Sequence, residues 1–254
     1  DRVSKAIIEA KEKELHMLNQ SKMAQMGEVL SMIAHQWRQP LTAISATASS
    51  MEIKIALAKF DEKYFSEHLV SIQEYSQHLS STIDDFRNFF KDSKVAHKTT
   101  FEQIIKSTMS IINTSLQDRS ITINIENSYI EPLCIYENEF KQVALNLFKN
   151  AEDALLENNI KNGMIKIKTY KKEQNAVFEI IDNAGGIKDE IAKQIFDPYF
   201  STKDTKNGTG LGLYMSKTII QEHCFGTLEH SNTEDGSKFT IVIDPNRFCD
   251  EANL

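Results

Sequence analysis

The sequence predicts an α+β protein in which a long helical hairpin is followed by a sandwich of helices and strands. Apolar residues recur at steps of three and four over roughly the first 90 positions, which is typical of amphipathic helices. Beyond about position 120, alternating apolar and polar residues appear between further helical segments. Because several strand-like segments are adjacent in the chain, we expect helices on one face of a sheet.

The first long helix carries its apolar residues on one stripe. The stripe comprises Met26, Leu30, Ile33, Trp37, Leu41, Ile44, Ala48, Met51 and Ile55. His35 lies about 200° from this stripe around the helix, so we expect it to face solvent. Pro40 removes the helical bond to the carbonyl of Gln36, which predicts a kink just after His35. The charged residues 1–21 have weaker helical spacing and indicate either a solvated helix or a coiled-coil lead-in helix.

A second helix is expected after a turn at residues 60–63, and it should run to about Lys91. Its stripe alternates steps of three and four and consists of Leu69, Ile72, Ser76, Leu79, Ile83, Phe86 and Phe90. One hairpin cannot cover a broad apolar face on each helix. Two copies that pair into a four-helix bundle would cover both faces, which predicts a homodimer. The alternative is that the hairpin packs onto the rest of the chain.

A polar, aperiodic linker is expected next, over residues 93–100, and a mixed domain after it, over residues 101–247. In this domain helical patterns cover about 101–116, 137–158 and a segment ending near Glu222. Strand patterns cover about 121–126, 133–136, 164–170, 175–182, 226–231 and 237–243. A loop with a short helix is expected over 183–210, and residues 248–254 are a C-terminal tail.

Composition excludes several classes of function. The formal net charge of −7 argues against nucleic acid as the main partner. The three cysteines, Cys134, Cys224 and Cys249, are far apart and lack metal-binding spacing, which predicts reduced thiols. No apolar run approaches the ~18 residues of a membrane span, and no signal-peptide pattern is visible. Since the chain does not begin with Met, we expect a fragment whose sensor or membrane segment, if there is one, lies upstream.

The first chemically suggestive segment is Asn146–Leu155. Asn146, Lys149, Asn150 and Asp153 are spaced three and four apart, so they share one helix face. An apolar stripe of Val143, Leu147, Ala151 and Leu155 would be buried on the opposite side. Carboxamide oxygens suit a Mg²⁺ ion that keeps water and phosphate ligands, and a lysine can contact phosphate as a point charge. Alone, the segment predicts no more than a polar helix face.

Three further segments lie downstream. Asp182–Ile187 follows a strand, where the carboxylate can accept a hydrogen bond from an exocyclic amine and the glycines permit close backbone approach. Residues 196–203 read Phe-Asp-Pro-Tyr-Phe-Ser-Thr-Lys, and 208–213 read Gly-Thr-Gly-Leu-Gly-Leu before a helix. Such glycines can cradle phosphates through backbone N–H groups. The spacing fits neither a Walker loop nor a Rossmann turn. The residues between the last two segments indicate a mobile lid.

Together, in this order, these segments resemble the motifs of sensor histidine protein kinases over roughly residues 22–243. His35 with Gln39-Pro40-Leu41 resembles the phosphoacceptor box. Asn146–Asn150 resembles the N box, Asp182–Gly186 the first glycine box, Phe196–Phe200 the F box and Gly208–Gly212 the second glycine box. The Gln-Pro-Leu and Asn-Ala-x-Asp-Ala sequences resemble the branch with nitrogen-regulatory and dicarboxylate-sensing kinases.

The resemblance implies a role for each matching residue. His35 would accept the γ-phosphoryl group of ATP, and Asn150 with Asn146 would hold Mg²⁺. Lys149 would contact phosphates, with Asp153 in the same ATP-binding set. Asp182 would bind the adenine amino group, and Gly186 would allow close approach. Gly208, Gly210 and Gly212 would shape the lid and phosphate loop.

Three positions depart from the family pattern. Gln36 stands where many members carry Glu or Asp and cannot take a proton, so either the neutral imidazole of His35 attacks unaided or another group assists it. Gln39 replaces a shorter residue that orients water for dephosphorylation of the partner. Ala184 replaces a common glycine, which is tolerated if its φ is negative.

The resemblance therefore implies an ATP- and Mg²⁺-dependent homodimeric kinase. Residues 22–92 would form the dimerisation and phosphotransfer hairpin, and residues 101–247 the catalytic ATP-binding domain of the gyrase and histidine-kinase type. Its partner would be a response-regulator receiver domain, and its location cytoplasmic, including the cytoplasmic part of a membrane-bound sensor. Two alternatives remain open: a gyrase-type ATPase that drives conformational change, and a nucleotide-binding dimer scaffold without catalysis.

Overall fold

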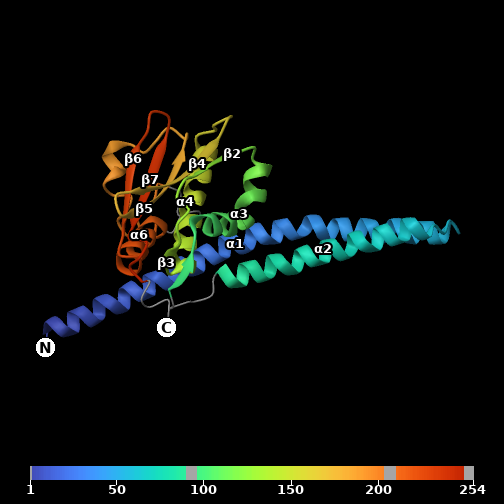
Figure 1. The fold of residues 1–254 in the computed structure, drawn as a ribbon, viewed down its shortest axis with the longest axis horizontal. Helices are drawn as coiled ribbons and strands as arrows, with labels where there is room; N and C mark the ends of the chain where they lie inside the picture. Colours follow the sequence, from blue (N-terminus) through green and yellow to red (C-terminus); the bar gives the residue numbers. More distant parts are fainter. Residues whose placement is uncertain (1, 90–95, 203–209, 249–254) are drawn as a thin grey trace.

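Two long helices form a hairpin in the N-terminal part of the computed structural model, which describes residues 2–89, 96–202 and 210–248. Helix α1 (Arg2–Ala56) is followed by a short loop and by α2 (Glu62–Phe89), close to the predicted turn. Figure 1 shows that the turn of the hairpin projects away from the C-terminal domain, which lies beside α1. The molecule is therefore elongated, with a helical arm and an α/β domain.

Helix α1 continues through Pro40. On the C-terminal side of His35, the Oγ1 atom of Thr42 donates a hydrogen bond to the carbonyl of Arg38, over 2.7 Å. The missing N–H of Pro40 removes one bond of the ladder, and its neighbours on both sides remain helical. Any bend at Pro40 therefore occurs within a single helix.

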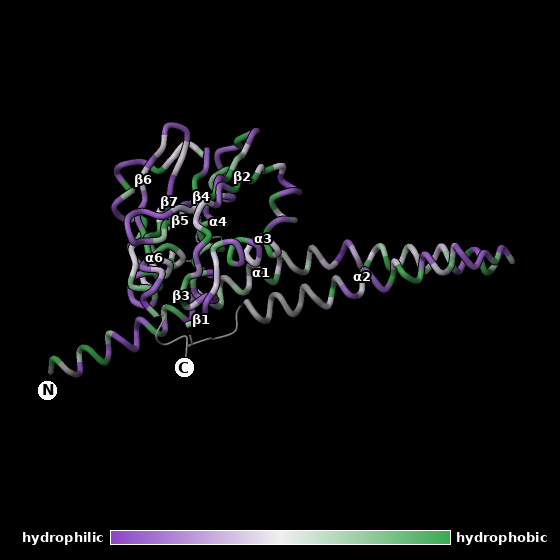
Figure 2. Tube along the Cα trace, in the orientation of Figure 1, coloured by the Kyte–Doolittle hydropathy of each residue, from purple (hydrophilic) through white to green (hydrophobic). Residues whose placement is uncertain are grey.

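Apolar residues remain uncovered on the hairpin. Leu30, Leu41 and Leu69 are each more than half exposed within one chain. Figure 2 shows hydrophobic residues interspersed with hydrophilic ones along both helices of the arm. The alternative arrangement, in which the hairpin packs onto the rest of the chain, holds only in part: Leu18, Met26 and Trp37 of α1 pack against the core of the C-terminal domain.

The C-terminal domain is built on a five-stranded mixed sheet with the order β2-β4-β5-β7-β6. The strands are β2 (Thr122–Asn127), β4 (Met164–Lys172), β5 (Asn175–Asp182), β6 (Thr227–Asn232) and β7 (Ser237–Ile243). The β2–β4 pair is parallel and the other neighbours are antiparallel. All five strands lie close to their predicted positions.

Three helical segments pack on one face of this sheet and bury the core (Figure 1). They are α3 (Phe101–Asp118), α4 (Glu137–Glu157) and α6 (Gly212–Thr218), which continues as a π-helical turn over Ile219–His223. Helix α4 packs on β4 and β5, and the end of α6 packs on β6. The one-sided α/β sandwich that the sequence predicts is confirmed. The short helix predicted in the loop is α5 (Asp189–Ala192).

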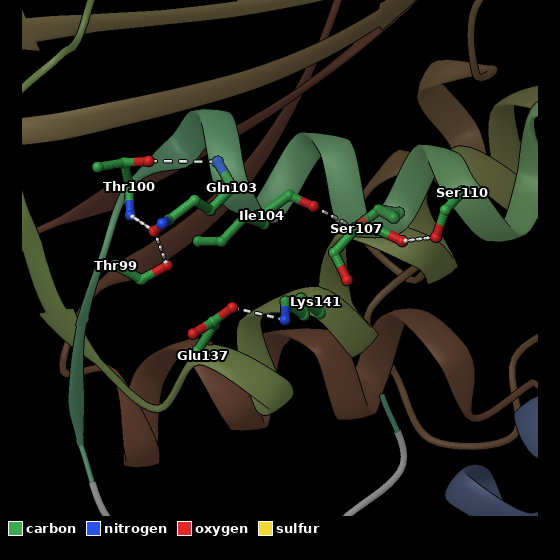
Figure 3. A network of polar contacts seen from close by, with 9 residues as sticks. Thr99, Thr100, Gln103, Ile104, Ser107, Ser110, Glu137 and Lys141 are labelled. Atoms are coloured by element: carbon green, nitrogen blue, oxygen red, sulfur yellow. Dashed lines mark hydrogen bonds and ion pairs between the residues drawn. The ribbon is translucent and has the colours of Figure 1, made fainter. Parts of the chain in front are cut away.

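The linker predicted over residues 93–100 contains a short strand near its C-terminal end, which its aperiodic sequence does not indicate. Strand β1 (His97–Thr99) pairs with β3 (Leu133–Ile135) in a separate two-stranded sheet. Thr100 then caps α3, because its side chain accepts from the backbone of Gln103 and the side chain of Gln103 accepts from the backbone of Thr100 (Figure 3). Three residues are too few to give a periodic signal, so the strand depends on its distant partner.

The prediction of reduced thiols holds for one of the two described cysteines and fails for the other. Cys224 is free, and its burial raises the pKa of the thiol well above its usual range, which keeps it protonated. Cys134 in β3 is disulfide-bonded, so the prediction is wrong for this residue. Sequence spacing does not reveal such a pairing, because it depends on which Cα atoms the fold brings together. No helix among the described residues has the length and apolarity needed to cross a membrane.

Candidate nucleotide-binding site

A cavity of about 460 Å³ lies between α4, the end of β5, the loop that follows it and the start of α6. It brings together Asn146, Lys149, Asn150, Asp153 and Asp182, which the sequence placed in two separate segments. Ala184, Gly186, Phe200, Gly210 and Gly212 also line it. Gly208 and the predicted lid lie outside the described residues. A cavity of this size suits a small-molecule ligand.

Helix α4 presents its polar face to the cavity because its opposite face is buried in the core. Val143, Leu147 and Ala151 are each at most 4% exposed, as the spacing predicts. This burial fixes the rotation of the helix, so the residues at steps of three and four on the other side point together. The polar segment is thus more than a solvated face.

Lys149 is already engaged in ion pairs. Its Nζ atom lies 2.8 Å from Oε2 of Glu152 and 3.2 Å from Oδ1 of Asp153. Burial by itself lowers the pKa of Lys149, but the two carboxylates outweigh it and raise the pKa. Lys149 is therefore charged at neutral pH, and it would have to share or exchange these partners to contact a phosphate.

Glu152 is a buried carboxylate that the sequence analysis did not single out. It is 2% exposed and accepts a hydrogen bond from Oγ of Ser115 over 2.7 Å. Arg119, like Ser115 a neighbour from the end of α3, places a guanidinium nitrogen 3.3 Å from the same oxygen. Since these partners come from another helix, their meeting depends on tertiary packing. The cluster joins α3 to the helix that carries the cavity residues.

Asn146 is fixed by Ser216, another residue that the sequence analysis missed. The Nδ2 atom of Asn146 donates to Oγ of Ser216 over 2.9 Å, and Ser216 is 2% exposed. A Cβ atom at Gly212 would lie 2.5 Å from Oδ1 of Asn146. The absence of a side chain at Gly212 therefore makes room for Asn146. The only sequence signal for Ser216 is its place one helical turn after Gly212.

The amide of Asn150 is the orphaned polar group of the cavity. Its Nδ2 atom is buried and has no hydrogen-bond partner among the described residues. A buried amide without a partner is costly, so a polar ligand that supplies one would be favoured. The described residues contain no cluster of three or more His, Cys, Asp or Glu side chains that could hold a metal ion. A Mg²⁺ ion here would therefore rest on amide oxygens, water and ligand phosphates, which matches its preference.

Asp182 ends β5 and is 6% exposed. Its Oδ1 atom accepts backbone hydrogen bonds from Ala184 over 2.9 Å and from Ser237 over 3.2 Å. Burial raises the pKa of this carboxyl, although the two N–H donors act in the opposite direction. Both bonds end on Oδ1, so Oδ2 is the oxygen that a ligand donor could reach.

The glycines serve tight packing around the cavity. Gly186 has φ +77° and Gly210 has φ +65°, both in the left-handed region. A Cβ atom at Gly210 would lie 2.4 Å from the carbonyl carbon of Tyr199, in the predicted F box. Ala184 is not among the non-glycine residues with positive φ, which agrees with the condition under which it replaces glycine.

The predicted acceptor lies on helix α1. His35 and Gln36 lie in α1, and their side chains are outside the described set. Gln39 is exposed on the same helix. Among the described residues, those that line the cavity belong to the C-terminal domain.

Two protein-family models match the chain at the two regions that the fold defines. The His Kinase A (phospho-acceptor) domain matches residues 25–93. The family of histidine kinase-, DNA gyrase B- and HSP90-like ATPases matches residues 135–247. The two matches, in this order, support a sensor histidine kinase catalytic core. The second match implies that the chain binds ATP.

Curated relatives are named accordingly. The chain is 29% identical over 92% of its length to the signal transduction histidine-protein kinase AtoS of Escherichia coli, of which it covers 37%. It is 29% identical over 87% of its length to sporulation kinase C of Bacillus subtilis, of which it covers 50%. The chain thus spans half or less of these two relatives.

Solved structures share the fold. The catalytic domain of histidine kinase ThkA covers 59% of the chain at a TM-score of 0.54 and 24% identity, with 95% of that domain covered. A structure of ThkA in complex with the response regulator TrrA covers 92% of the chain at a TM-score of 0.51 and 20% identity, with 66% of that chain covered. Both the hairpin and the sandwich of this chain therefore have counterparts in solved structures.

Proposed function

We propose that this chain is an ATP-dependent protein-histidine kinase core that phosphorylates His35 and passes the phosphoryl group to an aspartate of a response regulator. The observation that carries the proposal is the cavity in which Asp182, Asn146 and Asn150 converge, with Nδ2 of Asn150 lacking a partner among the described residues. The same chain carries His35 on a helix that belongs to the phosphoacceptor domain. These two observations support a donor site and an acceptor within one chain.

Each cavity residue has a proposed task. The free carboxylate oxygen of Asp182 accepts a hydrogen bond from the adenine amino group. Asn146 and Asn150 hold Mg²⁺, which when bound neutralises charge on the phosphates. Lys149 exchanges part of its contact with Glu152 and Asp153 for a phosphate oxygen. The intrahelical partners keep Lys149 charged and close to the cavity until then.

The transfer step uses the neutral imidazole of His35. The lone pair of one ring nitrogen forms a bond to the γ-phosphorus, while the bond from that phosphorus to the bridging oxygen of ADP breaks. Gln36 cannot accept the ring proton, which leaves to water. Because an imidazole with a pKa near 6.5 is mostly neutral at pH 7, positioning and charge neutralisation carry the catalysis.

The assembly we propose is a homodimer with residues 22–92 as its dimerisation and phosphotransfer hairpin and residues 101–247 as its catalytic domain. Residues 1–21 form a coiled-coil lead-in helix. The exposed apolar residues of the hairpin support pairing of two copies. The same proposal includes membership of the Gln-Pro-Leu branch, a cytoplasmic location and a receiver domain as the partner.

Incubation of the protein with γ-labelled ATP and Mg²⁺ tests the proposal. We expect a protein label that is acid-labile, alkali-stable and absent from His35→Ala. His97→Ala serves as the matched control, because His97 is an exposed histidine in β1, and it should keep the label. Free phosphate without protein label would favour a conformational ATPase instead. Bound ATP with neither product would favour a scaffold.

A further inference from the structure

Asn232, at the end of β6, holds the backbone of Ile187 with both atoms of its amide. Its Oδ1 atom accepts from the N–H of Ile187 over 2.8 Å, and its Nδ2 atom donates to the carbonyl of Ile187 over 2.7 Å. The two residues are 45 positions apart in the chain. A side-chain amide that pairs with both groups of one residue constrains that backbone in the way a neighbouring strand does.

The contact belongs to a larger junction between the β6–β7 turn and the loop after β5. The N–H of Gly185 donates to the carbonyl of Asp235 over 2.9 Å. A Cβ atom at Gly236 would lie 2.0 Å from the carbonyl oxygen of Asp182, so the two backbones touch. The β6–β7 turn therefore packs directly against the loop that begins at Asp182.

The loop needs such support because of its backbone conformation. Gly185 and Gly186 have φ values of +91° and +77°, and glycine loses more conformational freedom on ordering than other residues. A Cβ atom at Gly186 would lie 2.8 Å from Oδ1 of Asn232, so Asn232 fills the side on which a side chain would stand. The missing side chain of Gly186 thus admits Asn232.

Gly186 and Ile187 line the cavity, whereas Asn232 does not. We infer that Asn232 is a positioning residue that orders the Asp182–Ile187 loop for the nucleotide base. The inference rests on the proposed function, because it takes ATP as the ligand and the base as the part near Asp182. In this role Asn232 supplies order before binding, so the ligand does not have to order the loop itself.

Two variants separate the parts of the contact. Asn232→Ala removes both hydrogen bonds, whereas Asn232→Asp keeps an acceptor for the N–H of Ile187 and faces its carbonyl with a negative charge. Asn232 is exposed, and the contacts of Gly185, Gly236 and Ser237 remain, so both variants should fold. Asn124→Ala, at an exposed asparagine of β2, is the matched control.

Titration calorimetry with Mg·ATP and Mg·ADP, together with thermal unfolding of the ligand-free protein, tests the inference. We expect Asn232→Ala and Asn232→Asp to bind both nucleotides about fivefold to tenfold more weakly, since two exposed hydrogen bonds are lost or impaired. The factor should be equal for ATP and ADP, because the loop faces the base. At saturating ATP, the rate of His35 labelling should return to that of the wild type, so KM changes and kcat does not.

Three results would overturn the inference. One is nucleotide affinity within twofold of the control in both variants. Another is a loss confined to ATP, which would place the effect at the phosphates. The third is a fall in Tm large enough to account for the lost affinity. If the wild type binds nucleotide without labelling His35, the proposed kinase function fails and the inference about Asn232 is still decided by the affinities. If the wild type binds no nucleotide, both fail.

Discussion

Asn146 of α4, which lines the cavity, donates a hydrogen bond of 2.9 Å to the buried Ser216 of α6. The bond fixes which way the amide of Asn146 points and ties the start of α6 to α4. Gly212 lies against the oxygen of the same amide. The position of the Asn146 side chain therefore depends on Ser216, which is 70 positions away in the chain, and on the absence of a side chain at Gly212.

Replacement of Gly212 by alanine should displace Asn146. A Cβ atom 2.5 Å from Oδ1 of Asn146 meets a side chain that Ser216 holds in place. We expect Gly212→Ala to weaken Mg·ATP binding tenfold or more, equivalent to about 1.4 kcal/mol, and to lower stability by about 1–3 kcal/mol through overpacking. Calorimetry and thermal unfolding measure the two effects. Gly27→Ala is the control, since among the described residues nothing beyond its chain neighbours and its own helix backbone lies within 4 Å of its added Cβ. Equal affinities in the two variants would contradict the prediction.

Asp182→Asn should separate binding from stability. Burial raises the pKa of Asp182 in the folded protein above its ordinary value near 3.8. The folded state therefore binds the proton more tightly than the unfolded state, and the unfolding free energy contributed by this group falls as pH rises from about 3.8 through the raised pKa. We expect Asp182→Asn to bind ATP at least tenfold more weakly, while its stability at pH 7 equals or exceeds that of the wild type. Unfolding curves between pH 3 and 7 measure the difference. A variant that is less stable at pH 7 would show that ionised Asp182 supports the fold.

Glu139→Gln should alter the pH dependence of stability near neutrality. Oε2 of Glu139 lies 2.7 Å from Nδ1 of His223, and this bond raises the pKa of His223, against burial and with help from Glu222 and Glu14. Because the folded pKa exceeds the unfolded value of about 6.5, the stabilisation is complete below pH 6.5 and disappears as pH rises through the raised pKa. Its size is at most about 1 kcal/mol, since solvent screens a side chain that is 35% exposed.

Thermal unfolding from pH 5.5 to 9 measures this effect. The Tm difference between the wild type and Glu139→Gln should be largest at the acidic end and should shrink toward pH 9. Glu229→Gln, at an exposed glutamate of β6, should show no such trend. A constant difference across the range would mean that the pair contributes without proton uptake by His223.

Introducing charged residues into the apolar stripes of the helical arm should dissociate the proposed dimer. Leu41 and Leu69 are each 52% exposed in one chain and lie on the two predicted apolar stripes. Leu41→Glu with Leu69→Glu would bury like charges between paired copies, which costs far more than the leucines contribute. Light scattering after gel filtration should then give half the wild-type mass. Lys63→Glu, at a side chain that is 85% exposed, is the control. An unchanged mass would place the interface elsewhere.

The sequence was sufficient for features that depend on periodicity. The polar face of α4 with Asn146, Lys149 and Asn150 follows from residue spacing, because the buried stripe opposite fixes the rotation of the helix. The position of Asp182 at a strand end follows from an apolar run that stops there. Both features are local, and the structure brings them to one cavity.

The partners of these residues could not be predicted in the same way. Ser216, Asn232 and Glu152 are ordinary polar residues in their own segments. Each acquires its place through contacts with residues 37 to 70 positions away, which only the packing of helices on the sheet creates. Strand β1 likewise could not be predicted from its own sequence, because its three residues form a strand only by pairing with β3.

The short separation of α2 from β1 along the chain has a consequence for the proposed transfer from the cavity to His35. Phe89 ends α2 and His97 begins β1, and the segment between them can span at most about 29 Å even when fully extended. Under the proposed function, this limit on length keeps the cavity close to the helical arm, whichever copy of the chain supplies His35. Flexible residues inserted between α2 and β1 would lower the local concentration of the cavity around the arm only slowly as their number grows. The length of this segment also limits how far from the end of α2 the proposed phosphoryl acceptor can lie.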